Sequence, residues 1–149
     1  MNTASIAGLL PGTRAYCVSK HGVVALSEAL YNNLAQVGAP IGVSVLCPGL
    51  IDTRIMYAFR NRPARLLNTP GVQVTEREME RAERIGNMAS ELGLAPAEVA
   101  RIVVEAIRTD QFYVLTHTHF DEAIRTRTED MLARRRPAPY RSELDLPGA

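Results

Sequence analysis

The chain has 149 residues, which is long enough for one domain with a buried core. Apolar residues make up 46% of it and charged residues 22%, and both fractions are ordinary for a soluble globular protein. The net charge of +1 gives no reason to expect nucleic acid or an anionic membrane as a partner, and no apolar run approaches the ~20 residues that cross a bilayer.

The N-terminal residues and the cysteines bear on where the protein works. The first residues carry neither the basic segment nor the long apolar run of a signal peptide. The two cysteines, Cys17 and Cys47, do not form a disulfide framework, and we interpret them as inert thiols. These observations predict a cytoplasmic protein.

The chain begins with the end of a strand, over residues 1–5, and continues into a long helix. The helix is predicted from about Ala15 to Val37, where Gly38 ends it. Its apolar residues recur at three- and four-residue spacing and form one stripe, which consists of Val23, Leu26, Leu30, Leu34 and Val37. A second stripe is small enough to let another helix or a sheet approach closely, and it consists of Gly22, Ala25 and Ala29.

The middle of the chain contains a second strand and an irregular segment. Residues 41–47 are rich in β-formers and predict a parallel strand that Pro48-Gly49 stops. The segment from Arg54 to Val74 is irregular. Its apolar residues either line a pocket for an apolar substrate or cover the sheet edge, and they are Met56, Tyr57 and Phe59. Its arginines either attract an anionic substrate or form a solvated basic face, and they are Arg54, Arg60, Arg62 and Arg65.

Two helices are predicted next. Thr75-x-x-Glu78 has the form of a capping box, so a helix should run from there to Leu92 with Gly93 as its C-cap. Its inward residues are predicted to be Met79, Ala82, Ile85, Ala89 and Leu92. A further helix starts near Pro96, and one face of it carries Val99, Ile102, Val103, Ala106 and Ile107.

The C-terminal part is predicted to hold a last strand, a polar helix and a tail. The strand covers residues 112–116, and the helix runs from Phe120 to about Arg136. The apolar side of that helix is predicted to consist of Ile124, Met131 and Leu132. Residues 1–136 therefore form the folded part, and residues 137–149, which have three prolines and no apolar stripe, form a loose tail.

His117-x-His119 lies just after the last strand. Two histidines at this spacing suit a metal ion, but only Asp121 and Glu122 accompany them. We therefore interpret the pair as part of a loop or helix entry and predict no metal site.

Tyr16 and Lys20 lie four residues apart, so a helix places both on one face, about a turn from each other. A phenol is a poor base at neutral pH, and a nearby ammonium favours the phenolate that a general base needs. Ser5 comes before this pair, across a turn that contains Gly and Pro, and its hydroxyl can stabilise charge on a substrate oxygen. The group predicts proton transfer coupled to hydride transfer at an alcohol or ketone carbon.

At these residues the chain resembles the short-chain dehydrogenase/reductase family of NAD(P)-dependent oxidoreductases. Asn2-Thr3-Ala4-Ser5-x-x-Gly8 is similar to the strand end that carries the catalytic serine of the family. Tyr16-x-x-x-Lys20 matches its catalytic pair, and Pro48-Gly49-x-Ile51-x-Thr53 matches its segment at the nicotinamide end of the cofactor. The order and spacing of all three agree.

The resemblance implies an α/β fold, the C-terminal half of a Rossmann-type doubly wound parallel sheet. It implies Ser5, Tyr16 and Lys20 as catalytic residues, and NAD or NADP as cofactor. The cofactor would be held by Tyr16, Lys20, Pro48, Gly49, Ile51 and Thr53. It also implies a small, apolar alcohol or ketone as substrate, and a homodimer or homotetramer formed through the helix that starts near Tyr16. The alternative is that both stripes of that helix are buried inside one subunit.

The sequence also departs from the family. The Gly-rich phosphate loop, an Asn-Asn-Ala-Gly-like stretch and an upstream catalytic Asn of the family do not occur in it. We therefore expect that the natural protein starts before Met1. The alternative hypothesis is a truncated, catalytically inactive chain that serves only as a folded or oligomerising module.

Overall fold

The computed structural model describes residues 1–12, 14–66 and 74–140. The chain forms two compact units, which are described separately. The first consists of Met1–Gly49 and Ala97–Ser142, and the second is built around Leu50–Pro96. Among the described residues, no helix combines the length and the hydrophobicity that crossing a bilayer requires.

The first unit contains a parallel sheet of three strands. They are β1 (Asn2–Thr3), β2 (Val45–Cys47) and β3 (Tyr113–Leu115), and they lie in the order β1-β2-β3. In register, Asn2 is opposite Val45, and Leu46 is opposite Val114. The predicted α/β class with a parallel sheet is therefore confirmed.

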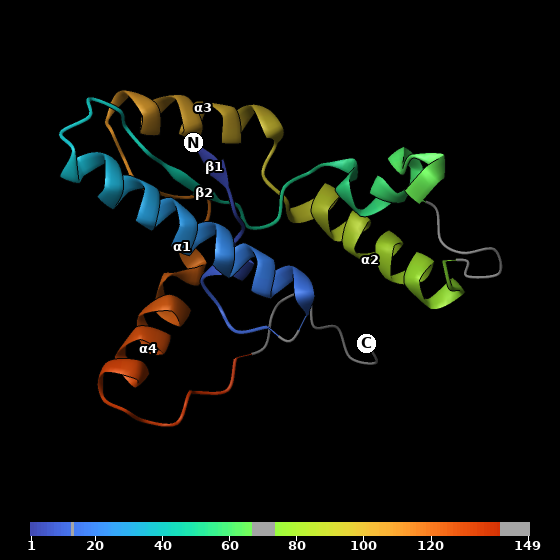
Figure 1. Ribbon diagram of the computed structural model, residues 1–149. Coiled ribbons are helices and arrows are strands. Elements are labelled where there is room, and N and C mark those ends of the chain that lie inside the picture. The colour runs from blue at the N-terminus through green and yellow to red at the C-terminus, as the bar shows by residue number, and fades with distance from the viewer. Residues whose placement is uncertain (13, 67–73, 141–149) are drawn as a thin grey trace. The chain divides into compact units, whose positions relative to one another are not determined.

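Helices cover both faces of this sheet (Figure 1). On one face, Val24 of α1 (Ala15–Gln36) packs against a buried cluster of Ala4, Val45 and Cys47. On the other face, Ala106 of α3 (Pro96–Arg108) packs against Leu46 and Val114. Neighbouring residues of a strand point to opposite faces, which explains why β2 is apolar at every position.

All three predicted strands are longer than the observed ones. Residues 41–44 and Phe112 lie outside the strands, although the carbonyl oxygens of Ser44 and Phe112 accept hydrogen bonds from the Asn2 and Val45 N–H groups, and Val43 and Ser44 are buried. The reason is that β1 offers only two residues for pairing, so the apolar run of β2 extends beyond its partner. Ile41 instead closes a turn, in which its N–H donates to the carbonyl oxygen of Ala39 at 2.8 Å.

The predicted limits of the first helix are confirmed, and three of the five residues in its predicted apolar stripe are exposed, namely Leu26, Leu30 and Val37. Gly38 follows the helix with a φ of +64°, the left-handed conformation that ends many helices. The residues buried against the sheet are Val24 and Ser27, whereas Leu26 is 65% exposed and Val37 is 77% exposed. Ser27 tolerates burial because its hydroxyl donates to the carbonyl oxygen of Val23 and accepts from the Asn2 amide at 3.0 Å.

The second unit contains α2 (Glu76–Leu92), and the predicted capping box at its start is confirmed. The Thr75 N–H donates to the Glu78 carboxylate at 2.8 Å, and the Glu78 N–H donates to the Thr75 hydroxyl at 3.2 Å. Ala82, Ile85 and Ala89 are buried as predicted. The inward positions predicted for Met79 and Leu92 are wrong, because both side chains are exposed.

Gly93 is the C-cap of α2, as predicted, but it does not adopt the left-handed conformation that often requires glycine at a helix end. Close packing of a neighbouring segment of the chain requires it instead. Its φ of −75° is open to any residue. A Cβ atom there would lie 2.8 Å from the Asp52 nitrogen, so the chain at residues 51–52 packs directly on the helix end. The segment before α2 forms two 3₁₀ turns, η2 (Arg54–Asn61) and η3 (Ala64–Leu66), and the rest of the predicted irregular segment up to residue 73 lies outside the described residues.

The last helix of the first unit, α4 (Asp121–Leu132), is shorter than predicted. Arg134 adopts a left-handed φ of 54°, and the buried Asp130 carboxylate binds the Arg135 side chain and the Ala138 N–H, each at 2.9 Å. The predicted apolar side is wrong at Met131 and Leu132, which are exposed, as is Ile107 of α3. The boundary of the tail at residue 137 stays a prediction, and residues 141–149 lie outside the described part.

Candidate active site

Three polar segments meet at one edge of the sheet, because the carboxyl ends of parallel strands lie together. Ser5 follows β1, Pro48 follows β2 and Thr116 follows β3. Backbone and side-chain hydrogen bonds connect these ends. The Ile6 N–H donates to the carbonyl oxygen of Pro48 at 2.9 Å, and the Gly49 N–H donates to the Thr116 hydroxyl at 3.1 Å.

Ser5 is held by its own loop. It has an extended backbone and caps the 3₁₀ turn η1 (Ile6–Gly8), where its Oγ accepts from the Ala7 N–H at 3.2 Å. The same oxygen lies 3.4 Å from the carbonyl oxygen of Pro48, to which it donates. The predicted serine is therefore tied to the predicted Pro48 segment.

Gly8 brings this loop against α1. A Cβ atom at Gly8 would lie 2.6 Å from the carbonyl oxygen of Lys20 and 3.2 Å from the Val24 side chain. Only a residue without a side chain permits this close approach. The loop that carries Ser5 therefore rests directly on the helix that carries Tyr16 and Lys20.

Tyr16 and Lys20 lie in the first turns of α1, as the sequence predicts. Tyr16 is 52% exposed, and the Lys20 Nζ lies 5.6 Å from the centroid of its ring. The same Nζ donates to the carbonyl oxygen of Thr3 at 3.1 Å. An ammonium has three N–H donors, so Lys20 keeps donors for a ligand after this bond.

Two of the predicted cofactor residues belong to the second unit. Ile51 pairs with Leu94 in a parallel bridge, and the exposed Thr53 precedes η2. The structure thus groups Ser5, Tyr16 and Lys20 with Pro48-Gly49 in the first unit. It does not group Ile51 and Thr53 with them.

The thiol of Cys47, directly before Pro48, is buried. Burial raises its pKa to about 11, and a hydrogen bond from the Ser5 backbone opposes this increase only in part. A thiol in this state is protonated at neutral pH and is a poor nucleophile. The interpretation of Cys47 as an inert core thiol fits this environment.

Thr116 and His117, at the end of β3, are not among the site residues that the sequence predicts. The Thr116 Oγ lies 2.7 Å from Nδ1 of His117, and the His117 ring packs beside His119 with ring centroids 5.3 Å apart. The signal for them is their position at the end of a predicted strand, whereas the sequence pattern assigns the histidine pair to a loop or helix entry. In the described part of the chain, no group of three potential metal ligands occurs.

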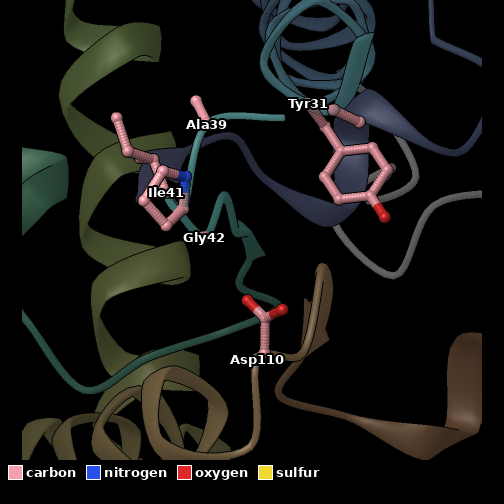
Figure 2. A pocket seen from close by; sticks show the side chains of 7 residues that line it. Tyr31, Ala39, Ile41, Gly42 and Asp110 are labelled. Atoms are coloured by element: carbon pink, nitrogen blue, oxygen red, sulfur yellow. The ribbon is translucent and has the colours of Figure 1, made fainter. Parts of the chain in front are cut away.

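A hollow of about 360 Å³ lies at the other end of the strands, before β2 and β3. It is lined by Tyr31, Ala35, Ala39, Pro40, Ile41, Gly42 and Asp110, and Figure 2 shows the Asp110 carboxylate directed toward Gly42. A Cβ atom at Gly42 would lie 2.6 Å from that carboxylate. None of the predicted site residues lines this hollow.

A parallel sheet with helices on both faces and polar residues beyond the strand ends defines a Rossmann-type α/β protein. A family model described as short chain dehydrogenase matches residues 1–64. A solved short-chain dehydrogenase/reductase from Burkholderia phymatum, in complex with NAD, has a TM-score of 0.80 and 38% identity, over 95% of this chain and 50% of that chain.

Curated relatives agree with these similarities. The CLA biosynthesis dehydrogenase/reductase of Lactiplantibacillus plantarum is 28% identical over 131 residues, which are 87% of this chain and 46% of that protein. The NAD(+)-dependent 15-hydroxyprostaglandin dehydrogenase of Mus musculus is 40% identical over 60 residues, which are 38% of this chain and 22% of that protein. The chain is thus similar in sequence and fold to short-chain dehydrogenases/reductases, and it spans less than half the length of these curated relatives.

Proposed function

We propose that the chain provides the acid–base residues of an NAD(P)-dependent oxidoreductase that interconverts an alcohol and a ketone. One observation carries this proposal. The Lys20 ammonium lies beside the Tyr16 ring and bonds to the last residue of β1, two residues before Ser5, at the carboxyl ends of the strands. Open α/β sheets bind their ligands at this edge.

Each residue has a distinct role in the proposed reaction. The Ser5 hydroxyl holds the substrate oxygen and stabilises the negative charge that develops on it. Tyr16 gives its phenol proton to that oxygen in reduction and takes it back in oxidation. The Lys20 ammonium lies beside the Tyr16 ring, and its remaining donors bind ribose hydroxyls of the cofactor.

The residues present suit a nicotinamide dinucleotide. Lys20 retains free donor capacity, Tyr16 is exposed, and the Pro48-Gly49 turn lies at the same edge of the sheet. When bound, the nicotinamide ring supplies or accepts the hydride. We propose NAD or NADP in this role. A structural neighbour binds NAD, and Ile51 and Thr53 stay predictions for the carboxamide end.

For the substrate, we propose a small, apolar alcohol or ketone. One relative is named for a hydroxyprostaglandin. We further propose that two or four copies associate through α1, and the cytoplasm stays the predicted location.

The proposal is tested first by titrating NADH and NADPH into the 149-residue chain, with fluorescence as the readout. We expect saturable binding of one of them, followed by reduction of a ketone to a secondary alcohol, in which the bound dinucleotide gives up its hydride and is oxidised. Tyr16→Phe should lower kcat by about 10²–10⁴ with little change in cofactor Kd, because only the proton transfer is lost. Tyr31→Phe removes a phenol hydroxyl from the same helix and serves as the matched control.

Two results would contradict the proposed function. One is a Tyr16→Phe variant that turns over within about tenfold of the parent. The other is a chain that binds neither dinucleotide at millimolar concentration.

A further inference from the structure

The Pro48–Gly49 turn does not stand alone, because the end of β3 holds it. The Gly49 N–H donates to the Thr116 hydroxyl at 3.1 Å, across 67 residues of sequence. A backbone N–H just beyond a strand end has no ladder partner, so this side-chain oxygen satisfies it. Thr116 therefore fixes the orientation of the peptide group between Pro48 and Gly49.

His117 in turn fixes the Thr116 hydroxyl. The Thr116 Oγ lies 2.7 Å from Nδ1 of His117. A hydroxyl has one proton and two acceptor positions, and Gly49 occupies one of the acceptors. The hydroxyl either donates its proton to Nδ1 or accepts one from it, and both arrangements hold the oxygen toward Gly49.

The turn is also confined sterically. A Cβ atom at Gly49 would lie 2.7 Å from Nδ1 of His117 and 2.9 Å from the Phe120 ring. Phe120 is buried, and the His117 and Phe120 ring centroids are 6.1 Å apart. The rings form a wall against which the Gly49 backbone lies directly, so the turn has little freedom to move toward β3.

We propose that Thr116, oriented by His117, is a positioning residue that holds the Pro48–Gly49 turn ready for the nicotinamide end of the cofactor. This inference rests on the proposed function. Ser5 bonds to the same turn from the other side, through the carbonyl oxygen of Pro48. Hydrogen bonds from the ends of β1 and β3 thus hold the turn from both sides. Loss of one of these bonds should weaken cofactor binding more than it lowers kcat.

The first test needs no cofactor. Hydrogen exchange at the Gly49 amide is measured by NMR in Thr116→Val, which removes the hydroxyl at nearly constant shape. We expect exchange about tenfold faster, the effect of losing one hydrogen bond. Thr116→Ser should restore the protection. Exchange at Val45, whose N–H donates to the carbonyl oxygen of Phe112 at 2.7 Å, should not change.

The second test is kinetic. Thr116→Val should raise the KM for the dinucleotide about fivefold to tenfold, with kcat within about twofold, as expected for loss of one positioning hydrogen bond. Thr116→Ser should lie near the parent. Thr109→Val is the matched control, because the Thr109 hydroxyl donates to the carbonyl oxygen of Glu105 at the end of α3, at 2.9 Å, away from the Pro48–Gly49 turn.

The outcomes separate the two proposals. Unchanged exchange at Gly49 in Thr116→Val overturns the positioning role, whether or not the chain is an enzyme. Faster exchange with an unchanged cofactor KM also overturns it. If the parent chain binds no dinucleotide, the proposed function fails and the cofactor role of Thr116 fails with it, while the exchange rates still decide whether the hydroxyl anchors the turn.

Discussion

At the scale of single residues, the environment of Cys47 has a measurable consequence. The thiol is 1% exposed and lies in the cluster with Ala4, Val24 and Val45. Burial disfavours the thiolate, so the folded chain keeps the proton to a pH near 11 rather than 9.0. Cys17, in the first turn of α1, is only half-buried.

The raised pKa of Cys47 predicts a loss of stability in alkaline solution. The unfolded thiol loses its proton first, so this contribution is fully present below pH 9.0 and is lost as the pH rises toward about 11. Between about pH 8 and about pH 10.5, the free energy of unfolding should fall by about 2 kcal/mol on account of this group. Urea unfolding at the two pH values measures the change.

Cys47→Ala should remove that part of the pH dependence, although it lowers stability at every pH because it leaves a small cavity. Cys17→Ala is the control for the loss of a cysteine and should keep the full alkaline decrease. An identical pH dependence in Cys47→Ala and in the parent would show that the buried thiol is not responsible.

At the scale of elements, the contact between η1 and α1 determines where Ser5 lies relative to Tyr16 and Lys20. The contact depends on Gly8, whose hydrogen faces the carbonyl oxygen of Lys20. Gly8→Ala should destabilise the chain by about 1–3 kcal/mol, because backbone on both sides must move apart. It should also reduce kcat in the proposed reaction, since Ser5 moves with its loop.

Gly22→Ala is the matched control for Gly8→Ala. Gly22 lies in the middle of α1, and a Cβ atom there would meet nothing within 4 Å. Alanine is the better helix former, so we expect about 0.5–1 kcal/mol of added stability and unchanged kcat. Thermal unfolding and steady-state kinetics on both variants give the comparison. A Gly8→Ala variant as stable as the parent would show that the two elements are not in close contact.

The elements also show how far the sequence alone reaches. The capping box at Thr75 and the limits of α1 were predictable, because a local pattern of three to five residues determines them. The buried face of α1 was not. Ser27 lies inward because the Asn2 amide binds its hydroxyl, and no periodicity of apolar residues reveals such a pair. In the site, the sequence predicts that Tyr16 and Lys20 lie together, because helical spacing brings them together. The contact between Thr116 and Gly49 was not predictable, because it depends on sheet register across 67 residues.

At the scale of the whole molecule, the exposed side of α1 is apolar. Leu26, Leu30 and Val37 belong to the apolar stripe that the sequence predicts, and they are exposed in a single copy. A helix with buried residues on one face and apolar residues on another is typical of an element at an interface. The proposed occupant of this face is α1 of a second copy, in an arrangement with twofold symmetry.

Association through α1 predicts how a charge on that face acts. The parent should sediment as a dimer or tetramer at micromolar concentration, and Leu26→Glu should shift it to the monomer, because symmetry places two such charges at one interface. Leu132→Glu is the matched control, since Leu132 of α4 is also exposed, at 75%. It should leave the mass unchanged. A parent that sediments as a monomer, or equal dissociation by both substitutions, would contradict a role for α1 in association.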